Sequence, residues 1–489
     1  MKLWVSFALP FVLLISGHLL WAEEPLPSVT ISEKSLIQMS EKTSPVRDGI
    51  RAKQSAVDLE KAQLESAFET RAHASYMYSE SREEGLASFI PIFSPQRNIA
   101  IGLSKQLPVG MNVKVEGFGE QINAPSANIN NATRSGVRLN LEVDLLKNFF
   151  GRVDRFALRE KTFAAKKAEI QSKLEQKDFE MNVRKLYWSL VANHLSLDLS
   201  EQLVKSAEQQ LKDALGRARA GAADQGDVAR SRAQLLSRKS SVYLFQYQKE
   251  QLEYQLKTIV PTLADKTIAT GAKDIDTAVK GVLSCVKSIT TDTQANSKYS
   301  DFFEVIAYTK EQFESEKTKA NATGDWDLKL HSSIQWSGVE EGFSKSIDEY
   351  NNNPKDGYSV GVALSIPLEG DLKEAERAHK ALVEHKYKSE IHSLELQIEQ
   401  THQQVSKSLL LLQEAAIALN QNVTNMKTSL KSNQRKYRQA RISINELIGE
   451  QDQLFSSELN EISTKLSVIH ALYDYFKIFN NHPCPQNNI

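Results

Sequence analysis

The 489-residue chain has few glycines and prolines, only two cysteines, and no excess of charge of either sign. The 21 Gly and 13 Pro residues are few for this length, which favours long uninterrupted helices over many short elements. Lysine and arginine number 60 against 61 aspartate and glutamate, so no basic excess indicates binding to nucleic acid. The sequence has one long apolar run, at its N-terminus, and this excludes a polytopic helical membrane protein.

The N-terminus has the pattern of a secretory signal peptide. Lys2 precedes an apolar stretch from Leu3 to Leu20, and acidic residues follow shortly afterwards. We therefore predict a signal peptide over residues 1–22 and export into an oxidising compartment. The alternative is an uncleaved membrane anchor, which is disfavoured because Pro10 and Gly17 interrupt a length that is barely sufficient to cross a bilayer.

A heptad pattern runs through the first half of the chain. Between residues 183 and 214, apolar and small residues recur at alternating steps of three and four, which predicts a left-handed supercoil. Residues 153–215 contain neither proline nor glycine, so one helix of roughly 95 Å is expected. After a break over residues 216–226, a second helix of roughly 50 Å is expected to continue to Pro261.

The same arrangement recurs near the C-terminus. A long helix over about 371–438 precedes a partner over about 445–479, and their lengths are roughly 100 Å and 50 Å. The upper part of each long helix cannot bury its seam alone, and helical segments at 31–67 and 302–322 are available to cover it. The alternative is a cytosolic-type dimeric coiled coil, but small seam residues such as Ala207 suit closely packed antiparallel helices better.

Between the helices, apolar residues alternate with polar or small ones in three segments, 137–145, 326–336 and 358–366. Each segment is about ten residues long, which is enough for a tilted strand to cross a bilayer. A soluble β-sandwich is the commoner meaning of such alternation. The predicted export, and the position of these segments at the ends of long helices, favour a transmembrane barrel with Trp326, Trp336 and Tyr358 available for its aromatic girdle.

Three weaker strands are predicted at 72–78, 99–103 and 111–115. The last two flank a turn and form a hairpin. The longer connections, 79–98 and 121–133, are expected to face outward. Six strands per chain is an even number, so the strands and helices keep consistent sides of a membrane.

Two tandem halves of this kind behind a signal peptide resemble the TolC-like outer-membrane efflux proteins over essentially the whole mature chain. The sharpest mark is the second turn, residues 437–447, which is similar to the family pattern aromatic-x-x-Gly-x-x-Ser/Thr-x-x-Asp/Glu-Val/Leu. The first turn, residues 218–228, matches the Gly and the Asp-Val of this pattern at the same separation, and residues 366–370 resemble the family's strand exit. Ala440 replaces the usual turn glycine, so any requirement for positive φ there must be relaxed or strained.

The resemblance implies an α+β fold that is mainly α. The implied assembly is a homotrimer that shares a transmembrane β-barrel in the bacterial outer membrane and continues as a coiled-coil barrel of helices across the periplasm. Family members commonly have two strands per half, which gives a twelve-stranded barrel. The additional hairpin at 99–116 either raises this number to eighteen or packs outside the barrel, and we expect it to join the barrel.

The resemblance also implies a function. This is an exit duct for multidrug efflux or type I protein secretion that works with a periplasmic adaptor protein and an inner-membrane transporter and contacts outer-membrane lipid. The alternative is a non-conducting coiled-coil scaffold or tether that spans the periplasm. His385 and His392 do not complete a metal site, and the sequence has no catalytic or phosphate-binding motif. We therefore expect no enzyme activity, no metal and no cofactor.

The two turns are the candidate entrance of the duct, at its periplasmic tip. The candidate residues there are Gly221, Asp227, Ala440, Arg441, Ser443 and Glu446. If Asp227 and Glu446 face the lumen, three copies of each carboxylate repel anions and attract cations. Alternatively, each carboxylate begins its return helix and interacts with the helix dipole. Arg441 is a candidate for pairing with a neighbouring helix.

The predicted divisions of the chain are the signal peptide, a first repeat, an irregular equatorial connecting segment, a second repeat and a C-terminal tail, at 1–22, 23–260, 261–300, 301–479 and 480–489. Both short helices climb about 50 Å from the tip, so their ends at Val260 and Phe479 are expected at similar heights. Cys285 and Cys484 follow these ends, and we predict a disulfide between them, with two free or partly buried thiols as the alternative.

Overall fold

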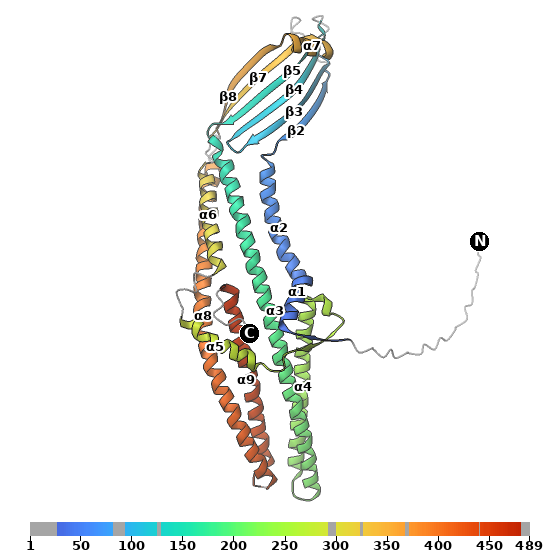
Figure 1. Cartoon of the computed structure of the whole chain (residues 1–489), viewed down its shortest axis with the longest axis vertical. Helices are drawn as coiled ribbons and strands as arrows, with labels where there is room; N and C mark the ends of the chain where they lie inside the picture. Colours follow the sequence, from blue (N-terminus) through green and yellow to red (C-terminus); the bar gives the residue numbers. More distant parts are fainter. Residues whose placement is uncertain are drawn as a thin grey trace, which may run out of the picture.

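The computed structural model describes residues 27–81, 93–124, 129–291, 300–322, 326–366, 371–439 and 441–480. The molecule is elongated, with a curved sheet at one end and long helices that run away from it (Figure 1). The predicted signal peptide lies outside the described residues.

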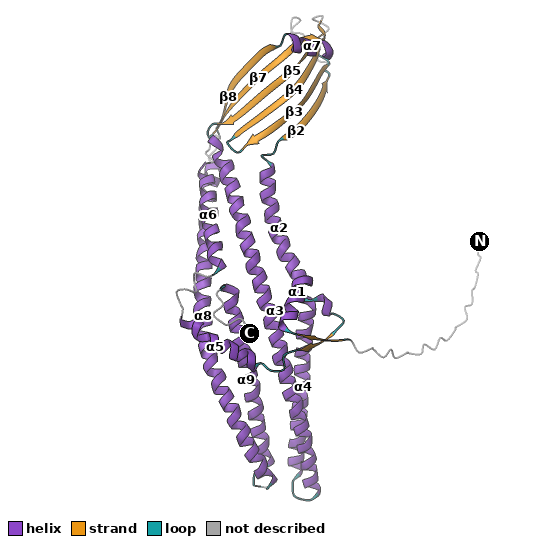
Figure 2. Cartoon of the chain, viewed as in Figure 1, coloured by secondary structure: helices purple, strands orange, loops and turns teal. Residues whose placement is uncertain are grey.

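The helices form two hairpins of equal dimensions. Helices α3 (Arg152–Arg219) and α8 (Asp371–Arg438) have 68 residues each, and α4 (Gln225–Ile259) and α9 (Ile444–Ile478) have 35 residues each. At 1.5 Å per residue, the long helices span about 100 Å and the short ones about 50 Å. The predicted duplication is therefore confirmed, and the two hairpin tips lie side by side at the end opposite the sheet (Figure 2). The predicted break over 216–226 is too wide, because Gly216 and Gly226 are both helical.

None of the helices in the described part of the chain combines enough length with enough apolar character to cross a membrane.

Two shorter helices cover the upper parts of the long ones. Helix α2 (Pro45–Ser66) packs on α3, and α6 (Asp301–Ala322) packs between α3 and α8. The start of α6 meets the end of α9, because the Ser300 hydroxyl donates to the Ile478 carbonyl at 2.6 Å and the Asn480 amide donates to Asp301 at 2.5 Å. Helices α9 and α6 thus follow one another along α3 and bury its seam.

The N-terminal helix predicted over 31–67 is wrong as a single element. The structure has strand β1 (Ser28–Ile31), helix α1 (Glu33–Thr43) and then α2. Ser44, between the helices, has an extended backbone with φ −77° and ψ 123°. Proline disfavours helical backbone in the residue before it and has no amide hydrogen to donate, so Pro45 starts a new helix.

The connecting segment predicted as irregular over 261–300 is ordered in its described part. It contains the 3-10 helix η3 (Pro261–Leu263), strand β6 (Thr267–Thr270), which pairs in parallel with β1, and helix α5 (Asp276–Thr291). Apolar residues at helical spacing already indicate α5, and four of them are buried: Val279, Val282, Val286 and Ile289.

The largest hydrophobic core lies at this level, halfway along the helices. Val260 and Phe479 are both fully buried in this one cluster, so the ends of α4 and α9 lie at similar heights, as expected. The predicted disulfide falls outside the described residues, because Cys484 is not described and the side chain of Cys285 in α5 is not described.

Within the described residues, six strands form one antiparallel sheet whose order follows the chain. They are β2 (Arg71–Ser79), β3 (Gln96–Leu107), β4 (Met111–Ala124), β5 (Ile129–Asp144), β7 (Asp327–Glu341) and β8 (Lys355–Ser365). All six predicted strands are present. Strands β5 and β7 have 16 and 15 residues, so the predicted length of about ten is too short for them, whereas β8 has 11. Most of the connection predicted at 121–133 is strand.

Helix α7 (Phe343–Asn352), between β7 and β8, was not expected from the sequence. It lies on a strip of small residues, Gly119, Ser135 and Gly338, which are paired in register across three strands. A Cβ on Gly338 would lie 2.2 Å from the Tyr350 amide nitrogen, and a Cβ on Gly119 would lie 2.5 Å from the Phe343 ring. The missing side chains on the sheet therefore make room for this helix.

Candidate functional site

One face of the sheet, outside the strip that α7 covers, is apolar and exposed. Directly paired residues point to the same side of a sheet, so each register row shows the composition of one face. One such row contains Ala72, Leu103, Val115, Leu139, Ile334 and Tyr358. The side chain of Tyr358 is 84% exposed and that of Leu103 is 55% exposed in the single chain. A face of this kind is expected to meet lipid or another apolar surface.

The opposite face is polar and cross-linked by charge. Glu116 on β4 is only 5% exposed, and it lies 2.5 Å from Lys114, 3.5 Å from His73 and 3.7 Å from Arg138. Arg138 on β5 also donates to Glu120 at 2.9 Å. His73 is on β2, so these contacts connect β2, β4 and β5 across the face. Polar residues on this side and apolar residues on the other are typical of a strand wall between lipid and a water-filled lumen.

The sheet has two free edges. Within the described residues, β2 pairs only with β3 and β8 pairs only with β7. Backbone groups along an unpaired edge have no water to bond with inside a bilayer. These two edges therefore need strands from other copies if the sheet lies in a membrane.

The hairpin tips are two turns of equal length, residues 220–224 and 439–443. Gly221 has a φ of +71°, a conformation that favours glycine. Asp224 accepts a hydrogen bond from the Asp227 amide at 2.7 Å, and Ser443 accepts one from the Glu446 amide at 3.2 Å. Asp227 and Glu446 thus occupy the same third position of their helices, where a carboxylate interacts favourably with the helix dipole.

The remaining predicted tip residues are placed as follows. The Asp227 carboxylate pairs with Arg230 on its own helix at 3.0 Å. The Arg441 amide donates to the Lys436 carbonyl at 2.9 Å, but in the described part of a single chain the Arg441 side chain makes no ion pair. Ala440 lies outside the described residues, so its backbone conformation stays a prediction.

Contacts that the sequence did not indicate join the two tips. The Arg217 guanidinium, at the end of α3, stacks 4.4 Å from the centre of the Tyr437 ring at the end of α8. Tyr437 is buried, which raises the pKa of its hydroxyl, and the charge of Arg217 opposes this rise. Further along, Arg238 on α4 pairs with Asp452 on α9 and stacks 4.6 Å from the Phe455 ring. Arg217 and Tyr437 both lie in the last turn of their long helices, and this shared position next to the two turns is the signal that could have suggested the link.

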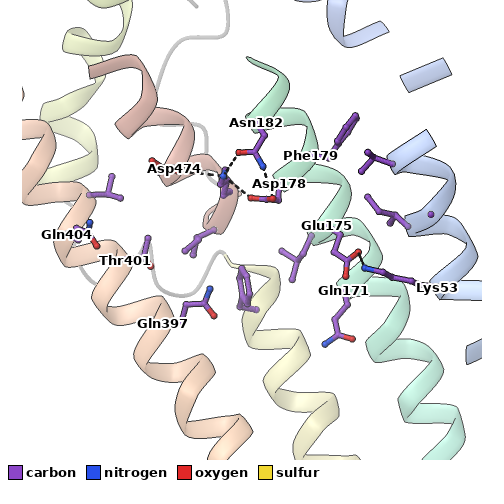
Figure 3. A pocket seen from close by; sticks show the side chains of 18 residues that line it. Lys53, Gln171, Glu175, Asp178, Phe179, Asn182, Gln397, Thr401, Gln404 and Asp474 are labelled. Carbon is purple, nitrogen blue, oxygen red and sulfur yellow. Dashed lines mark hydrogen bonds and ion pairs between the residues drawn. The ribbon is translucent and has the colours of Figure 1, made fainter. Parts of the chain in front are cut away.

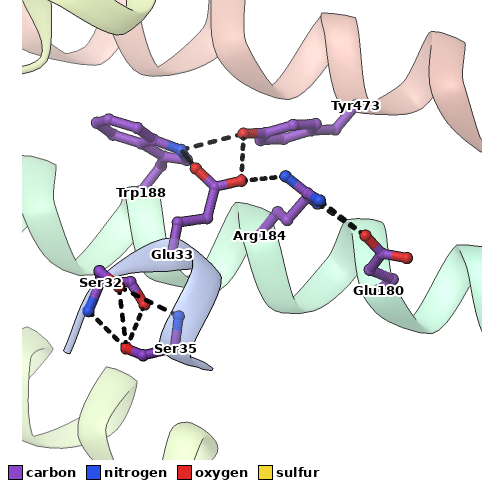
Figure 4. A network of polar contacts seen from close by, with 7 residues as sticks. All are labelled: Ser32, Glu33, Ser35, Glu180, Arg184, Trp188 and Tyr473. Carbon is purple, nitrogen blue, oxygen red and sulfur yellow. Dashed lines mark hydrogen bonds and ion pairs between the residues drawn. The ribbon is translucent and has the colours of Figure 1, made fainter. Parts of the chain in front are cut away.

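A partly buried polar network fastens the N-terminal helix to both hairpins (Figure 4). The Glu33 carboxylate on α1 accepts hydrogen bonds from Arg184 at 2.5 Å, from the Trp188 indole at 2.9 Å and from the Tyr473 hydroxyl at 3.0 Å. Burial raises the pKa of Tyr473, so its hydroxyl stays protonated and donates. One carboxylate thus holds α1, α3 and α9 together at the level of the central core.

A groove with a volume of about 930 Å³ lies between α2, α3 and α8, where α6 meets α9 (Figure 3). Its charged groups are already paired, Lys53 with Glu175 and Lys477 with Asp178, both at 2.9 Å. No cluster of three or more metal-ligating side chains occurs among the described residues. The groove therefore offers paired, solvated charges rather than a set of groups that converge on one ligand.

Comparisons with known proteins identify the fold. No protein-family model matches the chain, and no curated protein matches it by sequence. Among solved structures, it is similar to the outer membrane protein VceC of Vibrio cholerae, with 13% identity, a TM-score of 0.64 and coverage of 92% of this chain and 97% of that one. It is also similar to the outer membrane channel CmeC of Campylobacter jejuni, with 12% identity, a TM-score of 0.62 and coverage of 97% and 93%.

A third similar structure is the open state of the outer membrane channel MtrE of Neisseria gonorrhoeae, with 13% identity, a TM-score of 0.59 and coverage of 91% and 88%. The likeness extends over nearly the whole of each chain. It confirms the α+β, mainly helical, TolC-like fold that the two tandem halves predicted.

Proposed function

We propose that this protein is a channel of the bacterial outer membrane. In this proposal, three copies close their sheets into a transmembrane β-barrel and their helices extend it as a tunnel across the periplasm. The observation that carries the proposal is the two-faced sheet, apolar and exposed on one side and polar on the other, which continues directly into helices of 68 residues. The protein acts as a passive conduit, not as an enzyme.

Two independent features support assembly from several copies. The free edges of β2 and β8 require partners in lipid. The helices also expose apolar stripes, which lie along α4 and α8. These stripes are Leu236, Tyr243, Tyr247 and Tyr254 on α4, and Leu382, Leu396, Leu410 and Ile417 on α8. The α8 residues are separated by multiples of seven, as in a heptad seam that lacks its partner helix. A ring of copies brings Leu410 and Ile417 of one subunit against the α4 stripe of the next. Leu382 and Leu396 lie farther from the tip than α4 reaches, so they need another helix of the next copy.

The route of cargo follows from this geometry. The hairpin tips form the periplasmic entrance, where a periplasmic adaptor protein and an inner-membrane transporter meet the turns at 220–224 and 439–443. Cargo from multidrug efflux or type I protein secretion then leaves through the barrel. Neighbouring charges on the polar face of the sheet are paired, as Glu116 and Arg138 are, which suits passage of varied cargo better than tight binding of one molecule.

The competing proposal is a non-conducting scaffold, and planar-bilayer recording separates the two. The trimer is inserted as wild type and as Arg217→Ala, which removes the contact between the two tips. A duct is expected to conduct more often and at higher levels after this substitution. Arg219→Ala, at an exposed position two residues further along, is the control that keeps the contact and is expected to behave as wild type. Inserted protein that carries no current in any variant would favour the scaffold.

A further inference from the structure

The β3–β4 hairpin sits in the middle of the sheet, between β2 and β5. We infer that it is part of the barrel wall, so that the three-subunit assembly has eighteen strands, six from each chain, rather than the twelve common in TolC-like channels. This inference rests on the proposed channel function and adds the architecture of the membrane-spanning part.

The strand pairing of the hairpin leaves no way to close the barrel wall with fewer strands. Strand β3 pairs with β2 from Arg71↔Ser104 to Ser79↔Gln96, and with β4 from Gln96↔Ile122 to Leu107↔Met111. Strand β4 then pairs with β5 along its length. Strands β2 and β5 are therefore three strand spacings apart, about 14 Å, and cannot pair with each other if the hairpin is lifted out of the wall.

The two faces of the sheet continue through the hairpin without a change. Ile101 on β3 and Val115 on β4 lie on the apolar face, as Leu139 on β5 does. On the polar face, His73 of β2 reaches Glu116 of β4 across Gly102 of β3, at 3.5 Å. A Cβ on Gly102 would lie 2.7 Å from the Glu116 Cβ, so the glycine makes room for this contact.

The turn of the hairpin is fixed at the junction between sheet and helices. The Asp144 amide donates to the Gly110 carbonyl at 2.9 Å. The turn also touches the residue before α3, because a Cβ on Gly151 would lie 1.9 Å from the Pro108 carbonyl oxygen. Both glycines have positive φ, +72° and +68°. The hairpin therefore ends at the same level as the strands that lead into the long helices.

The tilt of the strands agrees with a closed barrel. The register row through Ala74 of β2 reaches Asp356 of β8. Ala74 is 74 − 71 = 3 residues from the helix end of its strand, and Asp356 is 365 − 356 = 9 residues from the helix end of its strand. From β2 to β8 the row therefore shifts by six residues along the strands over five strand spacings. This shift corresponds to a strand tilt of about 40° from the barrel axis, which lies within the range for barrels.

The circumference then distinguishes eighteen strands from twelve. At this spacing and tilt, eighteen strands measure about 110 Å around and twelve measure about 75 Å. The upper tunnel receives four helices from each chain, in the order α2, α3, α6 and α8. Twelve helices at an interaxial distance of about 9 Å measure about 110 Å around. An eighteen-stranded barrel thus joins the helical tunnel without narrowing, and the membrane segment is not the constriction of the duct.

Cysteine accessibility in the assembled protein tests this inference. In a Cys285→Ser, Cys484→Ser background, single cysteines replace Ala100, on the polar face of β3, and Ile101, on its apolar face. The matched controls in β8 are Ser359→Cys on the polar face and Val360→Cys on the apolar face. Trimers in lipid vesicles are treated with a water-soluble maleimide, and a lipid-dissolved maleimide is the second probe.

The expected result is the same alternation in both strands. Positions 100 and 359 react with the water-soluble probe, and positions 101 and 360 lose that reaction and react with the lipid-dissolved probe. Water-soluble labelling of both β3 positions, with alternation retained in β8, would overturn the eighteen-stranded barrel but leave the channel in place. Absence of trimers, or of current from the same preparation, would instead contradict the proposed function.

Discussion

The two helical hairpins have the same dimensions but opposite surroundings. Helix α9 lies between α3 and α8 and against α5, and its last turns are buried in the central core, with Val468, Leu472, Tyr473 and Phe476 among the buried residues. Helix α4 packs mainly on α3 and exposes its row of tyrosines. A repeated sequence pattern has thus produced one helix that completes the subunit and one that remains available for another copy.

The difference shows how duplication and assembly are related. A long helix has room for partners on several sides, and within one subunit α3 is covered by α2, α4, α6 and α9. Helix α4 lies at the margin of this group, so its outer face has no partner among the described residues of the single chain. In the proposed trimer, substitutions in α4 act on assembly and substitutions in α9 act on the stability of each subunit.

The largest effect is expected from the exposed tyrosines of α4. Replacing both Tyr243 and Tyr247 with Ser removes two large aromatic groups from the proposed contact between subunits, where such groups contribute most to binding. The trimer should be lost while the helical circular dichroism of the subunit is retained, as measured by native mass spectrometry and far-ultraviolet spectra. Gln246→Ser, at an exposed polar position on the same helix, is the control. A trimer that survives the double substitution would remove the distinction between the hairpins.

A cavity in α9 is expected to lower the stability of the subunit itself. Leu472 is fully buried, so Leu472→Ala should lower the free energy of unfolding by about 2–5 kcal/mol. Leu236 on α4 is 61% exposed, and Leu236→Ala should change the free energy of unfolding by less than about 0.5 kcal/mol. Urea unfolding is compared in the Tyr243→Ser, Tyr247→Ser background, so that subunit contacts do not contribute. Equal effects of the two substitutions would contradict the comparison.

Two glycines near the tip of the first hairpin are expected to change stability in opposite directions when each is replaced by alanine. Gly221 has a φ of +71°, and a Cβ there would meet nothing within 4 Å, so Gly221→Ala should cost about 1 kcal/mol through backbone strain alone. Gly216 is helical and equally open, so Gly216→Ala should stabilise the protein by about 0.5–1 kcal/mol. Thermal unfolding of both variants checks the signs, and the same sign for both would exclude strain at Gly221.

The smallest effect concerns pH and again involves α9. Burial lowers the pKa of His470, which lies 3.2 Å from the Lys185 carbonyl oxygen. The unfolded chain binds a proton at this histidine near pH 6.5, while the folded chain resists protonation. The contribution of neutral His470 to the free energy of unfolding is therefore present above pH 6.5 and is lost as the pH falls. Between pH 7.5 and 5, the free energy of unfolding should therefore fall less steeply in His470→Gln than in wild type. His385→Gln, at an exposed position on α8, should leave the slope unchanged.

Much of the fold could be read from local patterns. Long segments without glycine or proline that carry a heptad pattern predict the long helices. Both the hydrogen bonds within a helix and its apolar seam repeat at a fixed spacing along the chain. Alternation with period two predicts the strands for the same reason. Even the two elements that were predicted wrongly have local signals, because Pro45 marks the split between α1 and α2 and apolar residues recur at helical spacing around Val279.

Other features depend on residues that are far apart in the sequence. The contact of Arg217 with Tyr437 and the network around Glu33 exist because packed helices bring distant positions together. The place of α7 depends on glycines in two other strands, Gly119 and Gly338, that lie in register with Ser135. No local pattern carries this information, because it arises from registers and distances between elements.

The sequence by itself determined that this chain forms long paired helices and six amphipathic strands, because both follow from periodic contacts along the chain. Only the tertiary structure decided that the β3–β4 hairpin lies within the sheet, that the row across the sheet climbs six residues, and that α9 is buried while α4 is exposed. These depend on how strands and helices align with one another, and alignment is set by packing between elements rather than by the pattern within each.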